Sequence, residues 1–141
     1  MGRILALLVS CPLFLVADLK EIQKEPSLER RFELALAQAE TSLKEAKALL
    51  PGGEIKQLEE ALDEAASAAE LSLQALRETG KRPSKLSKQY KRGELKTRQY
   101  IRQLEDLEKA LGLQERPLAA KAKDRVTITH EEYLLGVMSK D

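Results

Sequence analysis

Residues 81–102 contain nine lysines and arginines and a single acid, Glu94. This basic segment begins at Lys81 and ends at Arg102, and four of its cations recur at spacings of three and four residues: Lys85, Lys88, Arg92 and Lys96. On a helix, such spacings place side chains on one face. A stripe of positive charge can hold phosphates, anionic lipid headgroups or an acidic polymer. These four residues are therefore the candidate anion-binding site.

A second interpretation of the basic segment is charge balance inside the fold. Its net charge is +8, whereas residues 18–80 carry −6 and residues 103–141 carry −2. Charge runs usually form solvated faces. Leu86, Tyr90 and Thr97 are expected to face the core, although Tyr90 and Tyr100 could also add stacking or hydrogen bonds to a ligand. Nucleic acid is disfavoured as a partner, because without residues 1–17 the chain has no net charge and it carries an export signal.

The residues available for catalysis are few. His130 is the only histidine, and His130-Glu131-Glu132 lacks the second histidine of a zinc-binding helix. The sequence contains neither a Gly-x-Ser-x-Gly elbow nor a Gly-rich phosphate loop. Carboxylates in residues 59–64 alternate with apolar residues, so we expect them to face solvent rather than a metal. The sequence therefore favours a protein that is not an enzyme and that uses no cofactor or metal.

Residues 1–17 have the features of a cleavable signal peptide. Arg3 precedes an uncharged apolar run over residues 4–17, which ends before Asp18. At about 1.5 Å per residue this run spans roughly 21 Å, less than the roughly 30 Å of a bilayer core. We expect an exported protein, periplasmic or extracellular, that begins near Asp18 and has no transmembrane span once cleaved.

Cys11 suggests a different form of export. Leu8-Val9-Ser10-Cys11 resembles the bacterial lipobox, so Cys11 is a candidate lipidation site that would anchor the protein to a membrane. The short apolar run before Cys11 and the apolar residues after it favour the ordinary signal peptide. Cys11 is also the only cysteine, so the folded domain contains no disulfide.

The composition indicates an all-α protein. Leu, Ala, Glu, Lys and Arg make up 85 of the 141 residues, above the roughly 50% that marks long helices and coiled coils. Apolar residues at helical spacing predict four helices, over residues 28–50, 55–76, 84–111 and 117–138. Ser27 and Ser84 are the expected N-caps of the first and third helices. The predicted stops are at residues 51–53, at residues 79–83 and at Gly112.

Short links between long helices predict an antiparallel up-and-down bundle of three to four helices, as a single domain over residues 27–141 after a lead-in at residues 18–26. The alanine-rich second helix is expected to be central. Gly93 could kink the third helix, and Thr129 with Glu132 could start a fresh helix at His130. The apolar tail at residues 133–138 is expected to close the core, or else to leave a patch for a partner.

These expectations favour an exported, non-catalytic structural or protein-interaction module. Its partner would be another protein or a second copy of the chain, because the heptad-like seams of the first two helices could form a coiled coil within one chain or between two. The alternative is a protein that uses the basic segment to bind an anionic polymer or the lipid headgroups of a membrane.

Overall fold

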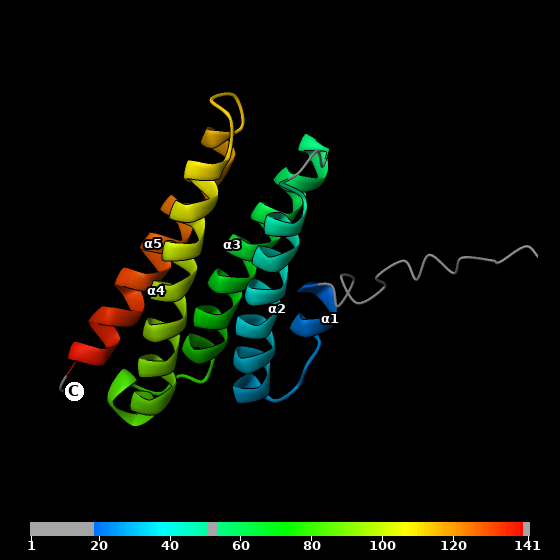
Figure 1. Cartoon of the computed structure of the whole chain (residues 1–141). Coiled ribbons are helices and arrows are strands. Elements are labelled where there is room, and N and C mark those ends of the chain that lie inside the picture. The colour runs from blue at the N-terminus through cyan, green and yellow to red at the C-terminus, as the bar shows by residue number, and fades with distance from the viewer. Residues whose placement is uncertain (1–18, 51–53, 140–141) are drawn as a thin grey trace, which may run out of the picture.

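The computed structural model describes residues 19–50 and 54–139. Within these residues the chain consists of helices joined by turns and has no strand, which confirms the all-α prediction (Figure 1). The predicted signal peptide and Cys11 lie outside the described residues. No helix in the described part of the chain is both long enough and apolar enough to cross a membrane.

The helices are one short segment followed by four long ones. The expected lead-in contains α1 (Leu19–Gln23), whose Ile22 is buried against α2 and α3. The long helices are α2 (Leu28–Ala48), α3 (Ile55–Glu78), α4 (Ser87–Ala110) and α5 (Arg116–Met138).

Two helical hairpins lie side by side. Helices α2 and α3 pack along their length, as do α4 and α5, and the hairpins meet where α3 contacts α5 and α2 contacts α4. Figure 1 shows that the α3–α4 turn, the start of α2 and the C-terminal end of α5 lie at one end of the molecule. The last turns of α2 and α4 lie at the other end.

Two helix boundaries follow the chemistry expected of them. Ser27 is the N-cap of α2, and its hydroxyl accepts a hydrogen bond from the Arg30 amide at 3.3 Å. Gly80 follows α3 with φ of +70°, a left-handed conformation that glycine adopts without a steric cost. The predictions for the start of α2 and the end of α3 are therefore confirmed.

The start of α4 differs from the prediction. Pro83 opens a 3-10 turn, η2 (Pro83–Leu86), and α4 begins only at Ser87. Ser84 therefore lies inside the turn and is not the N-cap. The physical reason is that proline has a preset φ and no N–H, which suits the first position of a helical turn, so the helical backbone begins before the serine.

The end of the chain is one continuous helix. A fresh start at His130 is wrong, because α5 runs unbroken through residues 126–129. Val126 and Thr129 are buried, and the Thr129 hydroxyl donates to the Arg125 carbonyl at 3.2 Å. Burial against the bundle thus outweighs the low helix propensity of β-branched residues.

Small residues allow the helices to approach closely. Helix α3 buries six alanines: Ala61, Ala65, Ala66, Ala68, Ala69 and Ala75. Between α4 and α5, the ring of Tyr133 covers Gly93 and the ring of Tyr90 covers Gly136, so that a Cβ on either glycine would overlap the ring. The two tyrosine rings meet edge to face with centroids 5.8 Å apart. Gly93 therefore does not break α4 but makes room for a neighbour.

Candidate anion-binding face

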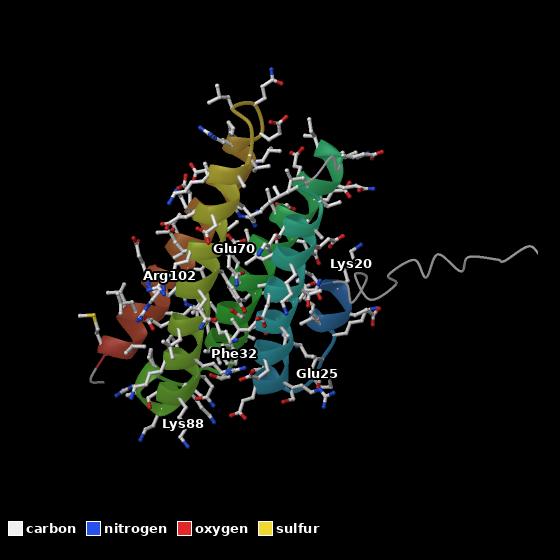
Figure 2. The ribbon with its side chains drawn as sticks, viewed as in Figure 1. Lys20, Glu25, Phe32, Glu70, Lys88 and Arg102 are labelled. Atoms are coloured by element: carbon white, nitrogen blue, oxygen red, sulfur yellow. The ribbon has the colours of Figure 1, made fainter. Side chains whose placement is uncertain are left out.

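The four candidate residues occupy the first part of the second hairpin. Lys85 lies in η2, and Lys88, Arg92 and Lys96 lie on α4. On the opposite side of this segment, Leu86, Tyr90 and Thr97 are buried in the core, as the helical spacing predicts. Figure 2 shows Lys88 at the end of the molecule that holds the α3–α4 turn.

The later half of the stripe is paired with α2. The Arg92 Nε atom lies 2.8 Å from the Glu33 carboxylate, and the Lys96 Nζ atom lies 4.0 Å from that of Glu40. These two cations therefore balance acids on the neighbouring hairpin, as the charge-balance interpretation expects.

The earlier half of the stripe is unpaired. Residues 79–93 contain no acid. Five exposed cations there have no carboxylate within 4.0 Å among the described residues: Lys81, Arg82, Lys85, Lys88 and Lys91. We call these five residues the basic end. Unpaired cations gathered at one end of a molecule attract anions over several ångströms of solvent.

The two tyrosines of the basic segment are buried in the bundle and are not exposed on the face that carries the cations. The Tyr100 hydroxyl donates to the Leu36 carbonyl at 2.6 Å and ties α4 to α2. Tyr90 is buried under α5. Burial raises the pKa of both phenols above the usual value of 10, so both stay neutral in the core.

A polar contact that the sequence did not predict joins α4 to α5. The Thr97 hydroxyl donates to the Gly93 carbonyl at 2.7 Å, so the 3.0 Å bond to His130 requires Nδ1 of the imidazole to be the donor. His130 thus holds two helices together from the middle of α5, rather than lying in the first turn of a short helix. Glu94, also buried here, pairs with Arg98 of its own helix.

Two acidic residues of α3, Asp63 and Glu70, form ion pairs with Arg125 of α5. Arg125 donates to Asp63 at 2.6 Å, to Glu70 at 2.6 Å and to the Ser67 hydroxyl at 2.9 Å. The bond with Glu70 is the main cause that raises the pKa of the Arg125 guanidinium. The described residues hold no group of three or more metal-ligating side chains. The sequence missed this clamp because its members lie more than 50 positions apart.

The apolar tail is only partly core, which corrects the prediction. Tyr133 is fully buried and Val137 packs against the core. Three other tail residues are exposed, with 38% of Leu134, 63% of Leu135 and 67% of Met138 open to solvent. The reason is geometric, because only one side of α5 faces the bundle and the tail is apolar on both.

The far end of the molecule has a cleft between α2 and α4. Its volume is about 440 Å³, and Leu43, Leu50 and Leu107 line it together with Lys44 and Lys47. Gln103, Asp106 and Ala110 complete the lining of this cleft.

The chain and its fold match no protein family model, no curated protein and no solved structure.

Proposed function

We propose that this chain is an exported, non-catalytic helical module that works by contacting another macromolecule through its surface. One observation carries the proposal: every buried side-chain nitrogen and oxygen of the described residues has a hydrogen-bond partner within the fold. Tyr133 donates to Ser72 at 2.6 Å, because the Ser72 hydroxyl itself donates to the Ala69 carbonyl. The interior polar groups therefore hold the scaffold together, and the unpaired charges lie outside it.

Export follows from the signal peptide expected at residues 1–17, and the N-terminus of the mature chain tests it. Mass spectrometry of the chain recovered from the exported fraction of its native cells should find a start near Asp18. If the chain instead begins at a lipid-modified Cys11, the protein is exported as a membrane-anchored lipoprotein. A chain retained in the cytosol with Met1 intact would contradict export.

The interaction role is tested by measuring whether the chain self-associates or binds another protein. Sedimentation of the purified protein distinguishes a self-associating chain from a monomer. Affinity purification from the same exported fraction should recover a stoichiometric partner if the chain is monomeric. A monomer that recovers no partner and turns over a substrate would contradict the proposal.

A second candidate function is anion binding by the basic end. The observation that favours it is the contrast within the stripe, where Lys85 and Lys88 are unpaired but Arg92 and Lys96 face acids of α2. We expect Lys85→Gln with Lys88→Gln to elute from heparin resin at clearly lower salt than the unchanged chain. The matched pair Arg92→Gln with Lys96→Gln removes the same charge and should have a smaller effect. Identical elution of all three proteins would contradict anion binding.

A further inference from the structure

We infer that the basic end docks on an anionic lipid bilayer, with the exposed side chains of Leu134, Leu135 and Met138 entering the headgroup region. This inference rests on the second candidate function, anion binding, and names the surface that would supply the anions.

The register of α4 against α5 places the cations and the exposed apolar side chains at the same height along the long axis of the hairpin. Tyr90 covers Gly136, and Tyr133 covers Gly93. Lys91 directly follows Tyr90 and Lys88 precedes it by two positions, while Leu135 directly precedes Gly136. Helix α5 also contacts η2, and η2 and the C-terminal end of α5 lie at the end of the molecule where Figure 2 shows Lys88.

Exposed apolar side chains lie on both helices of the second hairpin. Leu95, which is 52% exposed, lies in a shallow hollow of α4 lined by Lys88, Lys91 and Arg92. The C-terminal turn of α5 adds Leu135 and Met138, each more than 60% exposed. A contiguous patch of exposed apolar side chains marks a binding surface.

Most acids near this surface are already engaged. Glu33 pairs with Arg92, Glu132 with Arg77 of α3, and Glu94 with Arg98. Among the described residues, Glu131 is exposed one helical turn before Leu135 on the same face of α5, and Glu29 is exposed at the start of α2. The five cations of the basic end therefore outnumber these two exposed acids.

The combination selects a membrane over a soluble polyanion. An acidic polymer would need the cations alone, whereas a bilayer offers phosphates to the lysines and an acyl boundary to leucine and methionine. Long lysine side chains can keep their charge at the phosphates while their stems lie along apolar groups. Docking in this way leaves Tyr133 and the rest of the core in place.

Cosedimentation with vesicles tests the charge requirement. We expect the chain to bind vesicles of equal parts phosphatidylglycerol and phosphatidylcholine at low salt, and not vesicles of phosphatidylcholine alone. Each cation near an anionic surface contributes about fivefold, so Lys85→Gln, Lys88→Gln and Lys91→Gln together should weaken binding roughly 100-fold. The matched control changes Lys44, Lys47 and Lys109 to Gln, which removes the same charge at the far end and should bind nearly as the unchanged chain does.

The apolar requirement separates a bilayer from a soluble polyanion. Leu135→Gln with Met138→Gln should weaken vesicle binding about tenfold or more and leave retention on heparin resin unchanged. The control is Ile55→Gln with Leu113→Gln, which should change neither; Ile55 begins α3 and Leu113 lies in the α4–α5 turn, and both are exposed. All variants are at exposed positions, and an unchanged helical circular dichroism spectrum verifies that each is folded.

Two results would overturn the inference. If the Leu135 and Met138 changes leave vesicle binding intact, or if the two lysine triples weaken it equally, the basic end does not dock on a bilayer. Retention on heparin that depends on Lys85 and Lys88 would in that case leave anion binding standing. If the unchanged chain binds neither vesicles nor heparin, the second candidate function fails as well.

Discussion

At the scale of residues, two glycine–tyrosine pairs decide how closely α4 and α5 approach. We expect Gly136→Ala to destabilise the fold by about 1–3 kcal/mol, because the new methyl group overlaps the ring of Tyr90. Helix propensity alone predicts the opposite sign, a gain of about 1 kcal/mol. Urea unfolding measures the difference, with Gln99→Ala at an exposed position of α4 as control. A more stable Gly136→Ala protein would contradict the close contact.

The buried tyrosines predict how stability depends on alkaline pH. Burial raises the pKa of Tyr100 and Tyr133 in the folded state, whereas in the unfolded chain it is about 10. Above pH 10 the unfolded chain therefore loses protons that the folded chain keeps, and stability falls as the pH rises. Tyr133→Phe should cost about 1 kcal/mol at pH 7, and the cost should shrink above pH 10. If the stability cost of Tyr133→Phe is the same at pH 7 and above pH 10, the raised pKa of Tyr133 is contradicted.

At the scale of elements, the sequence predicted what depends on local chemistry. The apolar spacing located all four long helices, and Ser27 and Gly80 marked their boundaries, because caps and stops act within a few residues. The prediction that Ser84 is an N-cap was wrong, because the helical backbone already begins at Pro83. The unpaired half of the stripe and the Arg125 clamp could not be predicted, because both depend on which helices become neighbours.

The Arg125 clamp joins α3 to α5 and predicts a measurable contribution to stability. Arg125→Met keeps the packing of the stem but removes the bonds to Asp63 and Glu70. Because both carboxylates are partly exposed, we expect a loss of about 1 kcal/mol that shrinks at high salt. Arg77→Met removes one exposed pair across the same interface and should cost less, at most about 0.5 kcal/mol. Equal costs in thermal unfolding would refute the clamp.

At the scale of the whole molecule, charge and apolar surface are unevenly distributed. The acidic first hairpin neutralises the later half of the stripe through Glu33 and Glu40. The five cations of the basic end are left together at the α3–α4 turn, next to the exposed tail of α5. A chain that is almost neutral overall therefore presents one strongly positive end, which the net charge alone conceals.

Hydrogen–deuterium exchange with and without anionic vesicles tests most directly whether this end is the working surface. Amide exchange reports protection segment by segment along the chain. Docking as inferred should slow exchange in residues 79–91 and 134–139 and leave the last turns of α2 and α4 unchanged. Slower exchange confined to the far end, or no change in any segment, would contradict the account.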